Sequence, residues 1–312
     1  MRVNEVFKQA ASLGTVPVSF EMFPPKGELT LDTARKVAGS LCKLSPSFVS
    51  VTCSAGGSGN GATTAPIAHM ITSEFDTPSV AHLTCVGRTH ADIAAKIDEY
   101  RTAGVNNILA LRGDLPAGAT EDDKPASEYA YARDLIPELV DAGFCVGAAA
   151  YPEGHIACRS LEADISFLKQ KQDEGADYIM TQLCWDMDQF RYWMDAIRAA
   201  GIWLPVDVGI MPVLDAAATI NMALSRNGCV MSRDLCEIIS KNWIFPNPFA
   251  PNESEESIAA KKASFKEAGI EYTIKLIDEY RVCGINGIHL YALNKYDDVA
   301  RIVKESGIVD LI

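Results

Sequence analysis

Short apolar runs alternate with segments of helical apolar spacing along most of the chain. Runs of about four to eight apolar residues between turn residues are typical of buried strands, and apolar positions three and four apart are typical of amphipathic helices. We expect strands at 16–23, 48–53, 79–84, 108–111, 145–151, 177–182, 206–212 and 287–292. We expect helices at 31–44, 89–103, 127–142, 160–174, 186–200, 214–224, 232–241 and 258–283.

The order of these elements predicts an α/β architecture. Strands that alternate with helices run parallel, because each helix returns the chain to the end of the sheet where the next strand starts. Roughly eight such units in about 300 residues fit a closed (β/α)8 TIM barrel. We therefore expect residues 1–312 to form a single barrel domain, with an open doubly wound sheet as the alternative.

The predicted strand at 108–111 ends abruptly in a charged tripeptide. Arg112, Gly113 and Asp114 follow the apolar run, and Pro116 prevents further pairing in the sheet. A buried strand that delivers a cation and a carboxylate at its C-terminal end indicates either a binding site or an ion pair at the entrance of a loop. A single strand does not distinguish these two interpretations.

The other predicted strands end in the same way, which favours a binding site. In a barrel, the C-terminal ends of all strands meet on one face, where barrel active sites are built. The polar groups at these ends are Glu21, Thr52, His82, Arg112 with Asp114, Tyr151 with His155, Gln182, and Asn294 with Lys295. No Ser/His/Asp arrangement and no metal-ligand spacing are visible. The mixture suits a small-molecule enzyme whose ligand is polar, planar and able to form hydrogen bonds.

A glycine-rich segment at 56–61 resembles a dinucleotide-binding turn. Gly57, Gly59 and Ala62 fit the pattern G-x-G-x-x-A. That fingerprint requires the glycines directly after the first strand and an acidic residue at the end of the next one. Here the next predicted strand carries His82 instead, so we interpret the segment as a loop.

Composition and charge exclude several classes of protein. The chain is 48% hydrophobic and 22% charged, as in an ordinary globular protein, and its net charge of −13 argues against nucleic-acid binding. We find no signal peptide and no apolar stretch near the roughly 20 residues of a membrane span, so a cytoplasmic protein is expected. The 9 cysteines are scattered without a Cys-x-x-Cys pair, which indicates free thiols and no metal site.

The same strand-end residues resemble the methylenetetrahydrofolate reductases, flavin enzymes that reduce 5,10-methylenetetrahydrofolate to 5-methyltetrahydrofolate. The matching stretches occur in order along nearly the whole chain and are specific only as a set. They are 18–25 (VSFEMFPP), 48–52 (FVSVT), 82–85 (HLTC), 111–116 (LRGDLP), 149–155 (AAYPEGH), 181–182 (TQ) and 293–294 (LN). The resemblance implies a flavin- and folate-binding (β/α)8 catalytic domain.

The resemblance also implies roles for four residues toward the folate. Glu21 matches the family's general acid, which protonates N10 so that the folate ring opens to the N5 iminium; this requires a raised pKa. Asp114 matches the aspartate beside the flavin that holds the pterin and favours the cationic iminium. Gln182 matches the amide that binds the pterin. Lys295 stands where the family has an arginine and can still pair with a folate glutamate.

The cofactor implied by the resemblance is FAD, with FMN as the alternative. The positions that match flavin contacts are Thr52, Ala55, His82, Arg112, Gly113, Asp114, Tyr131, Ala132, Tyr151, His155, Asp164 and Lys171. Asp164 and Lys171 lie two helical turns apart on one face. From spacing alone that face would be solvated, whereas the resemblance implies that it points toward the ribityl chain and phosphate.

The electron donor stays open at this point. Bacterial relatives carry Gln and Phe where this chain has Ala218 and Met222, and those residues help to stack the nicotinamide cofactor or the folate tail. The resemblance therefore allows NAD(P)H as donor or an electron-supplying iron–sulfur or zinc partner subunit, in a homo- or hetero-oligomer. Two alternatives are a pterin-binding barrel for methyl or electron transfer without NAD(P)H activity of its own, and a non-catalytic scaffold subunit.

Overall fold

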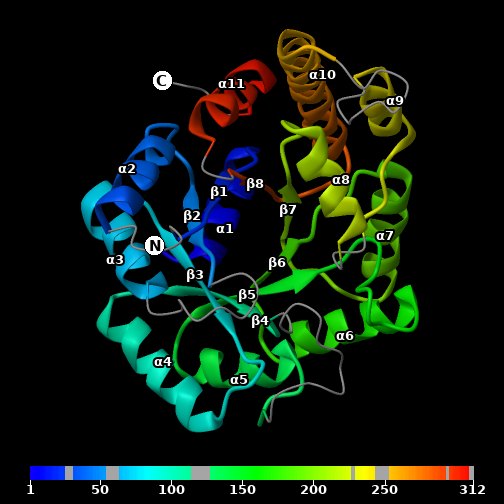
Figure 1. Cartoon of the computed structure of the whole chain (residues 1–312). Coiled ribbons are helices and arrows are strands. Elements are labelled where there is room, and N and C mark those ends of the chain that lie inside the picture. Colours follow the sequence, from blue (N-terminus) through cyan, green and yellow to red (C-terminus); the bar gives the residue numbers. More distant parts are fainter. Residues whose placement is uncertain are drawn as a thin grey trace.

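A computed structural model describes residues 1–24, 31–53, 63–113, 127–225, 229–242, 253–292 and 295–308. Eight parallel strands form a closed barrel in sequence order (Figure 1). The strands are β1 (Val18–Met22), β2 (Phe48–Val51), β3 (Ser79–Thr84), β4 (Asn107–Leu111), β5 (Cys145–Ala150), β6 (Tyr178–Thr181), β7 (Val206–Ile210) and β8 (Gly287–Tyr291). Pairing of β1 with β8, with Ser19 opposite His289, closes the ring. The predicted barrel is confirmed, and the open-sheet alternative is wrong.

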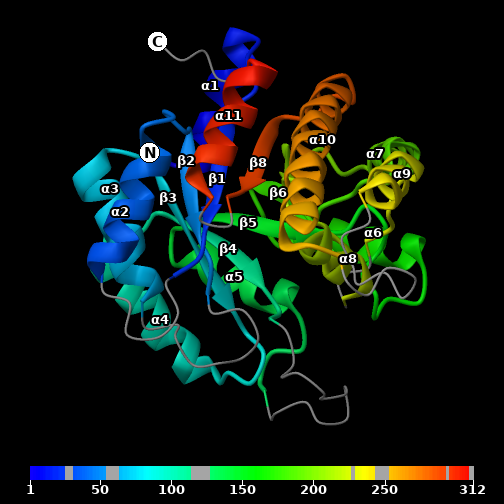
Figure 2. The same ribbon diagram turned by 45° about the horizontal axis from the view of Figure 1, so that its top comes forward.

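Helices surround the strands, with α2, α3 and α4 on one side and α9 and α10 on the other (Figure 2). The helices expected from the sequence are α2 (Leu31–Cys42), α4 (His90–Thr102), α5 (Ala132–Asp141), α6 (Leu161–Asp173), α7 (Met187–Ala199), α8 (Ala216–Leu224), α9 (Arg233–Lys241) and α10 (Glu255–Arg281). None of the helices in the described ranges is long and apolar enough to cross a membrane.

Helix α5 begins five residues later than the sequence predicted, at Ala132 rather than at 127. The Asp134 carboxylate accepts hydrogen bonds from the backbone N–H groups of Ala130 at 2.9 Å and Tyr131 at 2.8 Å. Asp134 thereby caps the helix and fixes its start. This start places Tyr131 and Ala132 at the beginning of the helix, beside the end of β4.

Three helices were not predicted: α1 (Val3–Leu13), α3 (Thr64–Phe75) and α11 (Tyr296–Ser306). Helix α1 lies within the ring of strands when the barrel is viewed along its axis (Figure 1). Its Phe7 ring lies 6.4 Å from Phe48 and 5.5 Å from Tyr178, both inside the barrel. The backbone N–H of Val3 donates to Asn107 Oδ1 at 2.8 Å. Helix α1 therefore closes the end of the barrel where the strands begin.

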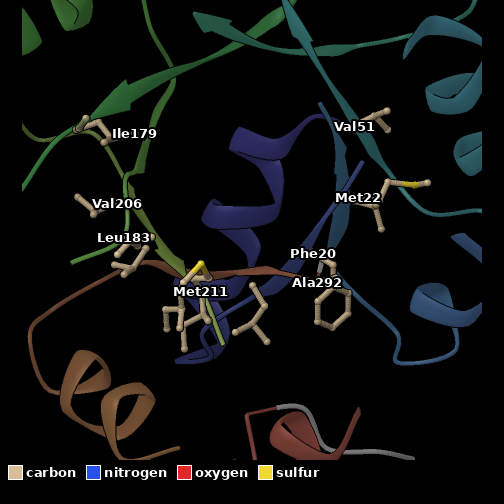
Figure 3. Close-up of a cluster of buried hydrophobic side chains, with 14 of the residues drawn as sticks. Phe20, Met22, Val51, Ile179, Leu183, Val206, Met211 and Ala292 are labelled. Atoms are coloured by element: carbon tan, nitrogen blue, oxygen red, sulfur yellow. The ribbon is translucent and has the colours of Figure 1, made fainter. Parts of the chain in front are cut away.

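The apolar core has two parts, as expected for a sheet closed on itself. One cluster lies inside the barrel and includes Phe7, Phe48 and Tyr178. The larger cluster lies between the strands and the surrounding helices and includes Phe20, Met22, Val51, Ile179 and Val206 (Figure 3). Alternate residues of each strand thus face the lumen and the helices, so the lumen holds this apolar cluster as well as polar strand residues such as Glu21.

Glycines on two strands make room for large side chains in the lumen. A Cβ at Gly147 would lie 2.5 Å from the Tyr178 ring, and a Cβ at Gly209 would lie 2.2 Å from Tyr291 Oη. The Tyr291 hydroxyl donates to the backbone oxygen of Thr181 at 3.0 Å. The glycines therefore allow the two phenols to cross the barrel interior.

Candidate active site

Glu21 lies near the C-terminal end of β1 and faces the lumen between two imidazoles. Its Oε2 is 3.8 Å from His82 Nε2 on β3 and 4.0 Å from His289 Nε2 on β8. The Glu21 side chain is 12% exposed, and the His289 side chain is fully buried. Neighbouring strands bring these groups together: Glu21 lies opposite Ser50 on β2 and opposite Tyr291 on β8.

Burial sets the protonation of this group of residues. It raises the pKa of Glu21 to about 8. It lowers the pKa of His82 to about 4 and the pKa of His289 to about 3. The imidazoles are therefore neutral at pH 7 and give Glu21 no cation to stabilise its carboxylate. Glu21 holds a proton at neutral pH, as a general acid requires.

Glu21 should make the stability of the fold depend on pH. The folded chain keeps the proton until the pH approaches the Glu21 pKa of about 8, whereas the unfolded chain loses it near the ordinary value of 4.5. Between these values the folded state binds more protons, so the free energy of unfolding falls as pH rises. Glu21→Gln removes this dependence. We expect the variant to gain about 2–5 kcal/mol over the unsubstituted chain at pH 8, and nothing at pH 4.

Urea unfolding of both proteins at several pH values measures this difference. A difference that grows steadily between pH 4 and pH 8 is the expected result. A constant difference across the same range would mean that Glu21 is already ionised in the folded chain, and it would contradict the assigned protonation.

Beside the barrel mouth, a cavity of about 250 Å³ opens between the ends of β4 and β5 and the helices α5 and α6. It collects many of the positions that the resemblance assigns to the flavin. These are Arg112, Tyr131, Ala132, Tyr151, His155, Asp164 and Lys171. The structure therefore brings together residues from four segments that are far apart in the sequence.

Lys171 is one of three half-buried cations among the described residues that line this cavity, together with Arg112 and Arg133. Its Nζ donates to the backbone oxygen of Ala149 on β5 at 2.7 Å and lies 6.0 Å from the centre of the Tyr151 ring. Burial lowers the Lys171 pKa to about 8, although Asp164 opposes the shift; Arg133 adds to it. Burial also raises the pKa of Asp164 against the influence of Lys171. The shared face of α6 points into the cavity, so the solvated-face interpretation is wrong.

Aromatic rings line the same cavity. Tyr151 and His155 meet edge to face, with ring centres 4.7 Å apart. The rings of Tyr131 and Phe167 are nearly parallel, 6.3 Å apart, and the Arg133 guanidinium lies 4.7 and 5.1 Å from their centres. Planar aromatic faces of this kind favour stacking with a planar ligand.

Arg133 and Phe167 also line the cavity but were not predicted, because they lie on the helices α5 and α6 and not at strand ends. Phe167 lies three residues after Asp164 and four before Lys171, so helical spacing alone places it on the same face of α6. Arg133 directly follows Ala132, but only the fold brings it over the Phe167 ring. No local signal in the sequence indicates that contact.

Two predicted residues carry buried polar atoms without a hydrogen-bond partner among the described residues, namely Thr52 Oγ1 and His82 Nε2. Their residues are 7% and 5% exposed. Buried polar atoms nearly always have a hydrogen-bond partner, so these two atoms indicate a bound ligand that forms hydrogen bonds with them. Both lie at the C-terminal ends of neighbouring strands, near Glu21.

Gly113 continues the β4 end with φ +90°, a conformation that favours glycine. A Cβ at this position would lie 2.9 Å from both Thr84 Cβ and Val86 Cγ1. The backbone N–H of Val86 donates to the oxygen of Arg112 at 2.8 Å. The glycine thus lets the chain after β4 pack against the chain after β3, which fixes the position of Arg112.

The remaining predicted site residues lie apart from the cavity or outside the described part of the chain. Gln182 follows β6 and is half-buried, and its Oε1 accepts from the backbone N–H of Leu183 at 2.9 Å. Lys295 is exposed and precedes α11. Ala55, Asp114 and Asn294 lie outside the described residues.

Comparison with known proteins gives the family. A family model described as methylenetetrahydrofolate reductase matches residues 6–307. The chain belongs to the methylenetetrahydrofolate reductase family. It is 31% identical to methylenetetrahydrofolate reductase 1 of Schizosaccharomyces pombe over 302 residues, which cover 95% of this chain and 46% of that protein. It is 36% identical to 5,10-methylenetetrahydrofolate reductase of Escherichia coli over 201 residues, which cover 64% of this chain and 66% of that protein.

The chain spans about half the length of the eukaryotic members of the family that it matches. A solved structure gives further support for the fold. It is an uncharacterized protein from Clostridium thermocellum that binds two copies of 5-methyl-5,6,7,8-tetrahydrofolic acid. The TM-score is 0.58 over 97% of this chain and 99% of that chain, at 14% sequence identity. At this identity the likeness shows the barrel fold alone.

Proposed function

We propose that this member of the family reduces 5,10-methylenetetrahydrofolate to 5-methyltetrahydrofolate with a bound flavin. The observation that carries the proposal is the position of the Glu21 carboxyl, which is 12% exposed in the barrel mouth and lies 3.8 and 4.0 Å from two buried imidazoles. Burial holds its pKa at about 8, so it keeps an acidic proton where a substrate entering the lumen can reach it. A scaffold subunit would not need a buried carboxyl that lowers the stability of the fold.

The cavity beside the mouth fits the proposed cofactor. Arg112, Arg133 and Lys171 line it and would bind the anionic phosphate part of a flavin nucleotide. The Tyr131 and Phe167 rings would stack on a planar group, and Thr52 Oγ1 and His82 Nε2 would form hydrogen bonds with the part nearest Glu21. When bound, a reduced flavin supplies the hydride for this reaction.

Glu21 supplies the proton in the proposed reaction. It donates to N10 of the folate, and the imidazolidine ring opens to the N5 iminium, the form that accepts a hydride. Gln182 would orient the pterin through its amide, and Asp114 would stabilise the positive iminium. Because the neighbouring imidazoles are neutral, they do not compete with Glu21 as strong acids.

The residues on α8 bear on which molecule donates the electrons. Ala218 and Met222 lie four residues apart on α8, where they present a small and a flexible apolar side chain. Neither offers an aromatic face or an amide to a nicotinamide ring. This favours a donor other than NADH, such as a partner subunit that carries electrons.

Anaerobic mixing of the purified, flavin-loaded protein with NADH, and separately with a low-potential chemical reductant, tests the proposal. We expect the low-potential reductant to bleach the visible flavin band, and methylenetetrahydrofolate to restore it. NADH should bleach the band at least tenfold more slowly.

Each outcome has a definite meaning. Rapid bleaching by NADH would contradict electron supply by a partner subunit, but it would still agree with the proposed reductase activity. A flavin band that methylenetetrahydrofolate does not restore would favour the pterin-binding alternative. Absence of any flavin band after reconstitution would overturn the redox function.

A further inference from the structure

A row of polar groups continues from Glu21 through the lumen toward the N-terminal ends of the strands. His289 Nε2 lies 3.1 Å from Ser50 Oγ, and His289 Nδ1 lies 2.7 Å from Ser19 Oγ. Ser19 Oγ lies 3.4 Å from Asp207 Oδ2 on β7. The row therefore connects Glu21 to a second buried carboxyl group.

Asp207 is fully buried, and a glycine on the neighbouring strand makes room for its carboxyl group. It lies opposite Gly287 on β8, where a Cβ would approach Asp207 Oδ1 to 2.5 Å. Only a glycine at that position leaves room for the carboxyl. Asp207 lies outside the cavity and the predicted strand-end site, and the proposed reaction does not use it.

The hydroxyl of Ser19 couples the two ends of this row. A serine hydroxyl has one proton to donate and lone pairs to accept. If Asp207 is protonated, it donates to Ser19, Ser19 donates to His289 Nδ1, and the imidazole proton resides on Nε2. If Asp207 is ionised, Ser19 donates to it and accepts from Nδ1–H, which leaves Nε2 without a proton and able to accept from the Ser50 hydroxyl.

These two arrangements present opposite dipoles to Glu21. An Nε2–H group 4.0 Å from Glu21 Oε2 stabilises the carboxylate, whereas a bare Nε2 favours the protonated carboxyl. The distance is longer than a hydrogen bond, so the effect is electrostatic, and the buried lumen screens it little.

We propose that Asp207 is a positioning residue for Glu21, because its protonation, relayed by Ser19, selects the tautomer of His289 and thereby sets how tightly Glu21 holds its proton. The effect of Asp207 on catalysis rests on the proposed function, in which Glu21 is the general acid. The tautomer and the titration of Glu21 are properties of the folded chain without substrate.

The other titratable groups of the lumen agree with this arrangement. Glu21 faces His82 and His289 directly, and its carboxylate form would raise the pKa of Tyr291. Asp207 acts on Tyr178 and on Tyr291, whose pKa values burial raises well above the ordinary phenol value. Both phenols stay neutral at physiological pH, and burial raises the pKa of Asp207 well above its usual range. No cation among the described residues acts on the Asp207 carboxyl, so we take its protonated, donating form as the starting state of the row.

Nuclear magnetic resonance of the folded, folate-free protein tests the proposal. Nitrogen-15 shifts of the His289 ring report the tautomer, and carbon-13 shifts of the Glu21 carboxyl report its titration. We expect the Nε2–H tautomer in the unsubstituted chain and in Asp207→Asn, whose amide still donates to Ser19. Ser19→Ala should give a mixture of tautomers and raise the Glu21 titration midpoint by about one pH unit.

Ser79→Ala is the matched control, since Ser79 is also a buried strand serine, but its hydroxyl contacts Thr72. It should leave both signals unchanged. An unaltered His289 tautomer in Ser19→Ala, or an altered tautomer without a shift in the Glu21 midpoint, would overturn the proposal. If Ser19→Ala fails to fold, Asp207→Leu removes the donor instead and should give the same mixture. Because no measurement uses folate, failure of the reductase function would leave this result intact.

Discussion

Replacing Glu21 by glutamine is expected to slow folate reduction by about 10²- to 10⁴-fold, the usual contribution of a general acid. Glutamine has nearly the same size and can still form hydrogen bonds, but it cannot give a proton to N10. The side chain does not line the cavity assigned to the flavin, so the variant should bind flavin normally. The loss should therefore fall on one half-reaction only.

Stopped-flow measurement of the two half-reactions separates these effects. Flavin reduction by a low-potential reductant should have the same rate in Glu21→Gln and in the unsubstituted protein. Reoxidation of the flavin by methylenetetrahydrofolate should be nearly lost in the variant. Glu99→Gln is a suitable control, because Glu99 forms an ion pair with Lys96 within α4, outside the barrel lumen, and should affect neither rate.

The pH dependence of flavin reoxidation is a second test of Glu21 as the general acid. Because the pKa of Glu21 is about 8, reoxidation by folate should be fast at pH 6–7 and should decline as pH rises through this value. Reoxidation that proceeds normally in the glutamine variant would show that another group protonates N10.

The barrel itself could be predicted because its strands are buried on both faces and its helices have clear apolar spacing. The helices that were missed carry similar signals in less obvious form. In α1, buried Val3, Val6, Phe7 and Ala10 follow helical spacing. This spacing is a local signal for a helix, although none was predicted there. That this helix closes the barrel depends on contacts of Phe7 with distant strands, which no local pattern contains.

The site residues that could be predicted are those at the C-terminal ends of the strands, because these ends meet on one face of a barrel. Glu21, Thr52, His82 and Arg112 lie at the ends of strands, so the barrel brings them to one face. Asp207 stands in the interior of an apolar strand, where a polar residue indicates a lumen position. Its neighbours across the barrel, however, depend on the register between β7, β8 and β1. A single sequence does not contain this register.

Replacing Lys171 by methionine is expected to weaken flavin binding by about 10- to 100-fold, since a hydrogen bond with a charged group contributes about 1.5–3 kcal/mol. Methionine keeps most of the length of the side chain but removes the ammonium group. It also leaves the Ala149 oxygen without this donor and the Asp164 carboxylate without its nearby cation. A negative charge that stays in the cavity would further oppose an anionic cofactor.

Lys169→Met provides a closely matched control. Lys169 lies two residues earlier on α6, but its ammonium forms an ion pair with Asp173 on the exposed side of the helix. Fluorescence titration of the apoprotein with FAD and with FMN should give unchanged Kd values for this variant. A similar loss of affinity in both lysine variants would indicate that charge in general, rather than Lys171 in the cavity, attracts the cofactor.

The pH dependence of binding distinguishes the ammonium of Lys171 from its role in packing. Burial lowers the Lys171 pKa to about 8, so the cation is present at pH 6–7 and is lost as pH rises through that value. Flavin affinity of the unsubstituted protein should therefore fall between pH 7 and pH 9, whereas the methionine variant should bind weakly and equally across this range. Equal pH dependence in both proteins would show that Lys171 supports the cavity wall without contributing its charge.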